Sequence, residues 1–166
     1  MKLVFCHGLD SGPHGRKYHA MVDAGLDVHA PDFRGQNLEA RIRTLLDEIG
    51  ESSPPLSGSS YGGLVAVCAV VELSLKKRIM PGMLLLAPAL HLKEPPTDRL
   101  PLMPLCPTHI IHGIRDEIVP LAASHRFAAN DRHLVTVQEV DDDHSLAASM
   151  DIIVDAARQL AGEPAR

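Results

Sequence analysis

The stretch Gly58-Ser59-Ser60-Tyr61-Gly62-Gly63 decides how the rest of this sequence is interpreted. Gly58, Ser60 and Gly62 fit the pattern G-x-S-x-G, in which a serine lies on a sharp turn between a strand and a helix. Small residues on either side allow the strand and the helix to approach closely, so that the serine oxygen stands clear of the sheet. The apolar run 64–71 that follows is typical of a helix buried on every side.

Two other kinds of loop share some of these letters. A Gly/Ser-rich loop without any chemical role is common, and a phosphate-binding loop is also rich in glycine. The stretch has no Lys-Ser/Thr pair where a phosphate-binding loop requires one. Five letters do not separate the remaining possibilities, so the interpretation depends on partner residues elsewhere in the chain.

Composition sets the broad class of the protein. The 166 residues include 45% hydrophobic and 22% charged residues, which is ordinary for a soluble globular protein, and we expect one domain over residues 1–166. The net charge of −5 disfavours a nucleic-acid binder. No apolar run has membrane-spanning length, and the N-terminal apolar run is too short for a signal peptide. Three widely spaced cysteines in apolar surroundings are expected to be buried thiols in a reducing compartment, which favours the cytoplasm: Cys6, Cys68 and Cys106.

Short apolar runs alternate with segments of helical periodicity along the whole chain. This alternation predicts an α/β fold, a three-layer α/β/α sandwich with about six parallel strands. The proline-rich segment 91–107 predicts a loop, since prolines oppose helix formation. The expected strands are 3–6, 27–30, 54–57, 83–87, 108–111 and 133–140, and the expected helices are 16–24, 38–49, 64–71, 120–129 and 146–160.

A serine hydroxyl needs a base to become a nucleophile, and histidine is the usual base. Ligands of a parallel sheet bind beyond the carboxyl ends of its strands, and three of the ten histidines lie near such ends. His7 and His112 each precede a glycine, where packing or a backbone hydrogen bond explains them. We favour His144 as the base for Ser60. The histidines expected away from strand ends are His19, His29, His91, His125 and His133.

A third group must orient the imidazole of the base. Asp116 follows the fifth expected strand, where a salt bridge with Arg115 or capping of the helix at Pro120 are alternative roles. Glu117 is a further candidate. The aspartates at 141–143 directly precede the histidine and are expected to shape the turn and cap the last helix.

Together these segments resemble the α/β-hydrolase superfamily, whose chain order is Ser, Asp, His. His7-Gly8-Leu9 resembles the oxyanion loop of that family, and Asp32-Phe33-Arg34-Gly35 resembles the turn after its next strand. The similarity covers nearly the whole chain, but it starts at the third strand of the family, and no cap domain is expected at 91–107. The three segments that carry it are Gly58 to Gly63, then His112-Gly113-x-x-Asp116-x-x-Val119-Pro120, and Asp143-His144-Ser145-Leu146.

The resemblance implies a role for each candidate. Ser60 would be the nucleophile, Asp116 the orienting acid and His144 the base, with the backbone N–H groups of Leu9 and Tyr61 forming the oxyanion hole. The sequence looks most like small lidless bacterial esterases and thioesterases. This implies hydrolysis of a carboxylic ester or thioester of a small soluble substrate through an acyl-enzyme, with no metal, no organic cofactor and no nucleic-acid or membrane partner.

Other functions stay open at this stage. A peptidase or an acyltransferase of the same fold would use the same residues, and a non-catalytic binding protein would keep the fold without the chemistry. Arg16 and Lys17 lie near the expected oxyanion loop. Attraction of an anionic substrate is one interpretation of these two residues, but we expect both to be solvated helix residues.

Overall fold

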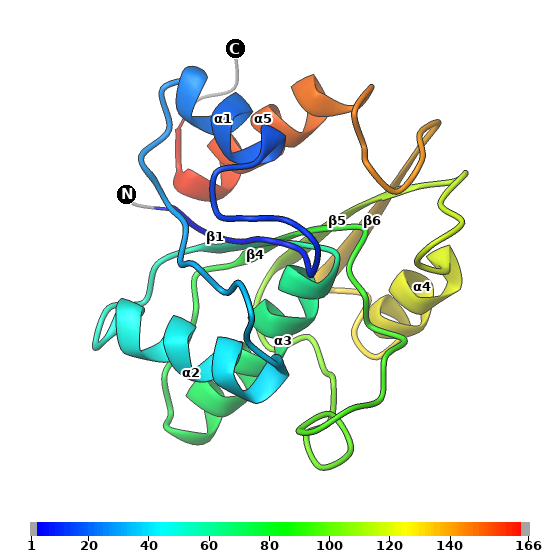
Figure 1. Cartoon of the computed structure of the whole chain (residues 1–166). Helices are drawn as coiled ribbons and strands as arrows, with labels where there is room; N and C mark the ends of the chain where they lie inside the picture. Colours follow the sequence, from blue (N-terminus) through cyan, green and yellow to red (C-terminus); the bar gives the residue numbers. More distant parts are fainter. Residues whose placement is uncertain (1–2, 164–166) are drawn as a thin grey trace.

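The computed structural model describes residues 3–163 and contains one parallel sheet with helices on both faces (Figure 1). Six strands lie in these residues in the order β2-β1-β3-β4-β5-β6, and all neighbours are parallel. The strands are β1 (Leu3–Cys6), β2 (Val28–His29), β3 (Leu56–Ser59), β4 (Met83–Leu86), β5 (Thr108–Gly113) and β6 (Val135–Val140). The helices are α1 (Arg16–Asp23), α2 (Leu38–Ile49), α3 (Tyr61–Leu75), α4 (Leu121–Ala129) and α5 (Met150–Ala161).

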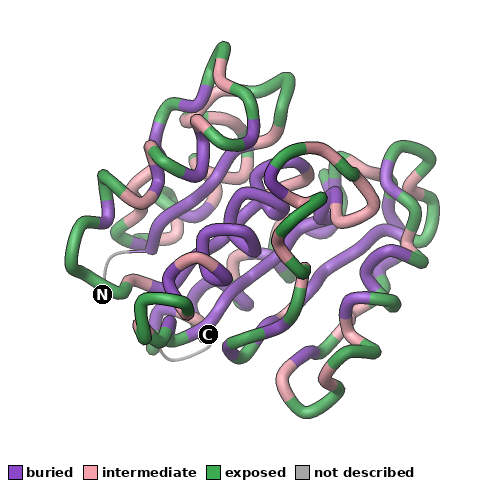
Figure 2. Tube along the Cα trace, turned by 90° about the horizontal axis from the view of Figure 1, so that it is seen from below, coloured by how far each residue is buried: buried purple, intermediate pink, exposed green. Residues whose placement is uncertain are grey.

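The sheet separates two hydrophobic cores, because successive side chains of a strand point to opposite faces. In β1, Val4 and Cys6 belong to the core beneath α2, α3 and α4, whereas Leu3 and Phe5 belong to the core beneath α1 and α5. Figure 2 shows the result as a buried central layer with exposed loops at its rim. This arrangement confirms the predicted three-layer α/β/α sandwich.

Helix α3 lies in the middle of the larger core. It is apolar all round and buried along nearly its whole length, as the run 64–71 predicts. It packs between the sheet and α2, which covers it with the stripe Leu38, Ile42, Leu45 and Ile49. The start of α3 is therefore held rigidly against the end of β3.

Several predicted boundaries need correction. The strand expected at 54–57 is β3, Leu56–Ser59, because the two prolines lie before the ladder while Gly58 and Ser59 pair with β4. Strand β5 extends through Gly113, so His112 lies in the strand and not in the loop after it. The last helix begins at Met150 rather than Leu146. The strand expected at 27–30 forms only two residues of β2.

Residues 91–107 contain turns and no helix or strand, as their prolines predict. No cap domain therefore covers the sheet edge within residues 3–163.

The three cysteines are free and buried, as expected. Burial raises the pKa of the Cys6 and Cys68 thiols to about 12 and that of Cys106 to about 11.

Across residues 3–163, every helix is too short or too polar to cross a bilayer.

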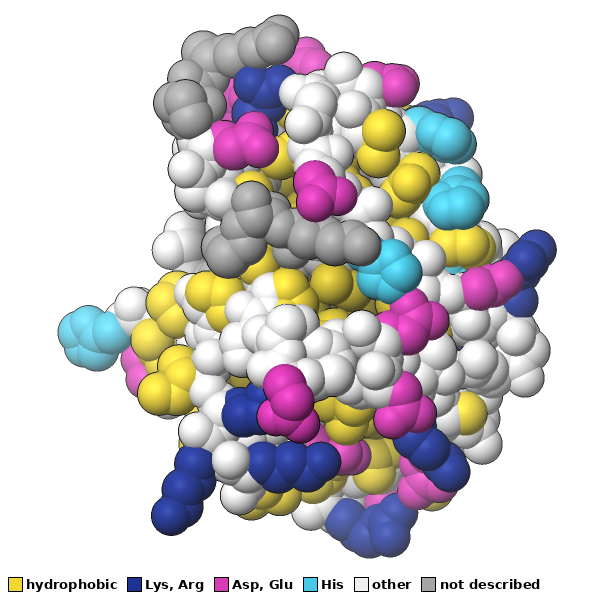
Figure 3. All heavy atoms as spheres, turned by 90° about the vertical axis from the view of Figure 1, so that its left-hand side faces the viewer, with side chains coloured by type: hydrophobic (Ala, Val, Ile, Leu, Met, Phe, Trp, Pro, Cys, Tyr) yellow, Lys and Arg dark blue, Asp and Glu magenta, His cyan; other side chains and the backbone are white. Residues whose placement is uncertain are grey.

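On the face of the molecule in Figure 3, Lys and Arg side chains gather mainly in the lower half, with Asp and Glu side chains between them.

Candidate active site

Ser60 lies at the junction of β3 and α3, at the carboxyl edge of the sheet. Its backbone has φ 54° and ψ −118°, a conformation that residues other than glycine rarely adopt. The Ser60 N–H donates to Leu86 O at 2.8 Å, and the Ser60 carbonyl accepts from the N–H groups of Gly63 and Ala89, each at 3.0 Å. These bonds to β4, to α3 and to the segment after β4 hold the strained turn in place.

The glycines of this stretch are required by close backbone contacts. A Cβ added at Gly62 would lie 2.0 Å from Cys6 O, and one at Gly58 would lie 2.4 Å from Gly62 O. Heavy atoms cannot approach so closely, so any side chain at these positions would separate α3 from β1 or β3. The geometry thus accounts for the G-x-S-x-G pattern.

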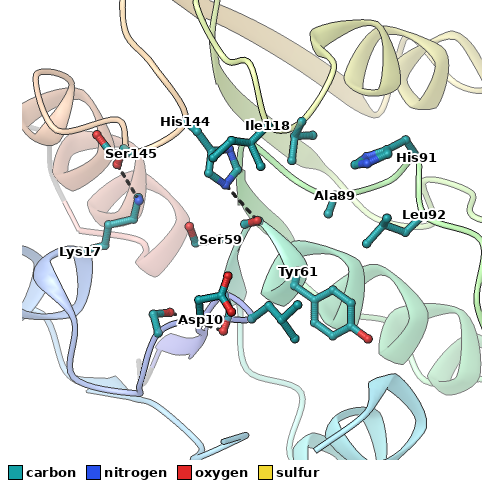
Figure 4. Close-up of a pocket in the computed structure, with 15 residues that line it drawn as sticks. Asp10, Lys17, Ser59, Tyr61, Ala89, His91, Leu92, Ile118, His144 and Ser145 are labelled. Carbon is teal, nitrogen blue, oxygen red and sulfur yellow. Dashed lines mark hydrogen bonds between the residues drawn. The ribbon is translucent and has the colours of Figure 1, made fainter. Parts of the chain in front are cut away.

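His144 and Asp116 reach Ser60 from the ends of two other strands. The Ser60 hydroxyl donates to His144 Nε2 at 3.0 Å, and His144 Nδ1–H donates to Asp116 Oδ2 at 2.7 Å. Asp116 follows β5 and His144 follows β6. Three residues that lie far apart in the sequence therefore form one hydrogen-bonded chain. The dashed line from His144 in Figure 4 marks the bond between His144 and Ser60.

The side chain of Asp116 is buried, and its carboxylate is satisfied by hydrogen bonds. Burial alone would raise its pKa, but the N–H groups of Val119 (2.8 Å) and Ile118 (2.9 Å) donate to Oδ1, and His144 donates to Oδ2. These bonds outweigh burial, so the pKa of Asp116 lies below its usual value. The group is an ionised carboxylate held in one orientation.

His112, for which the sequence analysis expected packing or a backbone hydrogen bond, is a second, buried partner of this carboxylate. Its Nε2 lies 3.1 Å from Asp116 Oδ2 and donates to Val119 O at 3.1 Å, while the Ser124 hydroxyl donates to Nδ1 at 2.8 Å. Burial lowers the pKa of His112. A neutral ring with its proton on Nε2 accepts from Ser124 at Nδ1 and donates to Val119 O from Nε2. The same Nε2–H points toward Asp116 Oδ2.

The three aspartates before His144 contact groups other than its imidazole. Asp142 is buried and accepts from the N–H groups of Asp143 and Ala148 and from the Ser149 hydroxyl, so it shapes this turn as expected. Asp143 accepts from the N–H and the hydroxyl of Ser145. Asp141 forms an exposed ion pair with Arg115, 3.0 Å from its Nε.

The loop after β1 forms the other side of the site. His7 is buried, its Nδ1–H donates to Gly8 O at 2.8 Å, and its Nε2 accepts from the Phe33 N–H at 2.9 Å. Burial lowers the pKa of His7, which fits the neutral ring that these bonds require. His7 therefore ties the start of this loop to the turn after β2.

Arg41 is a buried residue of α2 that the sequence analysis did not consider. Its guanidinium donates to the carbonyls of His7 (3.3 Å), Gly8 (3.2 Å) and Leu9 (3.4 Å), and lies 5.0 Å from the centroid of the Tyr61 ring. It thus fixes three successive carbonyls of the loop after β1. Position 41 falls on the apolar face of α2, three residues after Leu38. An arginine at such a position was the sequence signal that could have indicated a buried guanidinium.

A pocket of about 400 Å³ opens at Ser60 and His144. It lies where the loops of β1 and β3 diverge, which is the switch point of the strand order. Leu9 and Tyr61 both line it, and in the part of the chain that the structure describes neither N–H donates to a protein acceptor.

Two residues that were expected elsewhere also line the pocket: Lys17, which was expected to be a solvated helix residue, and His91, which was expected away from strand ends. Arg16 is exposed, as predicted. Among residues 3–163, no group of three or more His, Cys, Asp or Glu side chains is arranged to hold a metal ion.

Comparisons with known proteins bear on the fold. Neither a protein-family model nor a curated protein sequence matches the chain. Solved structures do match over nearly all of it. A protein of Xanthomonas campestris described as a hydrolase of the alpha/beta superfamily has a TM-score of 0.73 at 23% identity, over 97% of this chain and 96% of that chain.

Two further structures are similar at lower identity. The type II thioesterase BorB from the borrelidin biosynthetic cluster has a TM-score of 0.78 at 14% identity, over 99% of this chain and 92% of that chain. A second Xanthomonas campestris protein, described as an a/b serine hydrolase without lid, has a TM-score of 0.70 at 17% identity, over 99% and 83%. The resemblance inferred from the sequence is thus confirmed for the architecture, and the chain has the α/β-hydrolase fold.

Proposed function

We propose that the protein is a serine hydrolase that cleaves a carboxylic ester or thioester of a small soluble substrate. The observation that carries the proposal is the hydrogen-bonded chain from Ser60 through His144 to Asp116 at the mouth of a pocket. The fold is shared with solved structures described as a hydrolase of the alpha/beta superfamily and as a thioesterase, which supports the same class of reaction.

In the proposed reaction, Ser60 Oγ attacks the acyl carbonyl while His144 Nε2 takes the hydroxyl proton. The C–O or C–S bond to the leaving group breaks, and His144 returns the proton to that alcohol or thiol. Water then attacks the acyl-enzyme by the same route and releases the carboxylic acid and free Ser60. Asp116 keeps the His144 proton on Nδ1 and stabilises the imidazolium.

The negative oxygen of each tetrahedral intermediate needs hydrogen-bond donors. We assign this role to the backbone N–H groups of Leu9 and Tyr61, which line the pocket on either side of Ser60. Tyr61 is the first residue of α3, where the N–H groups of a helix have no internal partner.

A labelled fluorophosphonate separates this proposal from a binding protein that keeps the fold. A binding protein has no use for an activated serine, so it would not react, whereas the proposed enzyme is labelled at Ser60. An ester, thioester and amide panel then distinguishes an esterase or thioesterase from a peptidase.

The three buried thiols fit a reducing compartment, and we propose the cytoplasm as the location.

Arg41→Lys should lower kcat about tenfold with little change in KM. A lysine ammonium keeps the charge but cannot hold three carbonyls as a guanidinium does, so the Leu9 N–H loses its fixed direction. Donors to the oxyanion act mainly in the transition state, and loss of one outright costs about 10²–10³. The measurement is steady-state kinetics on a soluble ester. Arg43→Lys, an exposed residue of the same helix, is the control. An unchanged kcat for Arg41→Lys would contradict this role.

Activity should peak at short acyl chains and fall as the chain lengthens. The pocket of about 400 Å³ is open, and residues 91–107 form no helix that would cover a long chain. Each CH₂ that stays in water forgoes about 0.8 kcal/mol of binding energy, which is then not used to orient the ester. Nitrophenyl esters from acetyl to palmitoyl, with and without lipid interfaces, test this expectation. A steady rise to palmitoyl, or activation at an interface, would contradict it.

A further inference from the structure

The pocket has two chemically different walls. On one side of His144 lie Tyr61, Ala89, Leu92 and Ile118, which are mainly apolar, together with the imidazole of His91 (Figure 4). On the other side lie Lys17, Ser145 and Asp10, all with polar or charged side chains. Both walls adjoin Ser60, so a substrate spans them with one part against each.

Lys17 is the cation of the polar wall. It lies in the first turn of α1, its side chain is partly buried, and its Nζ donates to Ser145 O at 2.7 Å, one residue from His144. In the described residues no carboxylate oxygen lies within 4.0 Å of this ammonium. One of its three N–H donors is used, and two are available to the pocket.

The charges near Lys17 leave its ammonium only partly compensated. Burial and the positive charge of Arg16 lower its pKa, whereas the negative charges of Asp142 and Asp143 raise it. Both carboxylates are already engaged by groups of their own turn. Asp10 is exposed at the rim of the pocket, where water screens its charge. Because buried charges in proteins are usually paired, a partly buried cation without a close counterion among residues 3–163 is suited to bind an anion.

We infer that Lys17 is a specificity-determining residue that binds a carboxylate on the substrate. The inference rests on the proposed function and narrows its substrate class to esters or thioesters that carry a carboxylate on the acyl group or on the leaving group. The ammonium donates two hydrogen bonds to that carboxylate while the remainder of the substrate lies against the apolar wall. The carboxylate supplies the counterion that residues 3–163 do not place beside Lys17.

Two matched pairs of esters test this role. Mono-4-nitrophenyl adipate and 4-nitrophenyl hexanoate both have six-carbon acyl groups and differ in the terminal carboxylate. The pair 4-carboxyphenyl butanoate and phenyl butanoate places the carboxylate on the leaving group instead. For each pair the readout is the ratio of kcat/KM for the anionic ester to that for the neutral one, compared among variants, so that intrinsic ester reactivity cancels.

Lys17→Gln should lower this ratio about tenfold in at least one pair. Glutamine keeps an N–H donor for Ser145 O and removes only the charge, so a purely structural role of Lys17 would leave the ratio unmoved. Arg16→Gln is the control, since it makes the same change in net charge at an exposed neighbour and should leave both ratios as they are. Asp10→Asn should raise the ratio only slightly, because the negative charge that it removes from the rim of the pocket is already screened by water.

Three results would overturn the inference: equal ratios in wild type and Lys17→Gln for both pairs, an equal fall in Arg16→Gln, or a fall in Asp10→Asn. Lys17→Arg, which keeps the charge, should retain most of the preference and gives the comparison if Lys17→Gln fails to fold. The proposed function fails in a different way, because wild-type protein would then hydrolyse neither the neutral nor the anionic esters.

Discussion

Ser60→Ala should abolish ester hydrolysis and fluorophosphonate labelling while the protein still folds. The hydroxyl is the only group removed, and among the described residues its one hydrogen bond is the 3.0 Å bond to His144 Nε2. The strained backbone at φ 54° is held by main-chain bonds that alanine also makes. In the serine protease subtilisin the loss of the nucleophile costs about a millionfold in kcat, and we expect a loss of that order here.

The control is Ser59→Ala, which removes a hydroxyl from the adjacent residue and should still be labelled. Thermal unfolding of both variants checks that the fold is intact. Hydrolysis at the wild-type rate by Ser60→Ala, in a preparation free of other hydrolases, would show that another group is the nucleophile.

Asp116→Asn should lower kcat by about ten-thousandfold, as the same change does in the serine proteases. The asparagine oxygen still accepts from the N–H groups of Ile118 and Val119, so the loop keeps its shape. Its NH₂ group then faces His144 Nδ1 and donates to it. The imidazole proton moves to Nε2, which no longer accepts the proton of Ser60.

Asp143→Asn is the matched comparison, because Asp143 precedes the histidine in sequence but contacts Ser145 instead. The Asp143→Asn substitution removes one negative charge near His144, as Asp116→Asn does. We expect its kcat to stay within about tenfold of wild type, as an exposed charge screened by water has little influence on the imidazole. If Asp143→Asn is the more damaging of the two, the orienting role belongs to Asp143.

The order of elements and the meeting of Ser60, Asp116 and His144 could be predicted from the sequence, because parallel strands end at one edge of a sheet. The periodicity of α2 and the continuous apolar run of α3 were sufficient to place both helices. Boundaries were less accurate where pairing partners decide them. Gly58 and Ser59 have no intrinsic preference for a strand, and they extend β3 only because β1 and β4 lie on either side.

The rest of the pocket lining could not be predicted, because it depends on how loops cross the sheet edge. Lys17 enters the site through the path of residues 7–15, which brings it to Ser145, 128 positions later in the chain. His91 enters through the turn after β4. Arg41 is different, since its place on an apolar helix face already indicated a buried guanidinium that needs acceptors.

The contact between Gly62 and β1 has an evolutionary consequence. The obstacle to a side chain at Gly62 is the main-chain oxygen of Cys6, 2.0 Å from where a Cβ would lie, and no change of residue type at position 6 removes it. Every amino acid except glycine brings that Cβ, so each amino-acid substitution at position 62 would force α3 and β1 apart, whatever the polarity or size of the new side chain. Compensating changes elsewhere would have to shift the first strand of the chain against the sheet. Descendants of this sequence can therefore vary Lys17 and the rest of the pocket lining to reach new substrates, while the turn that presents Ser60 stays fixed.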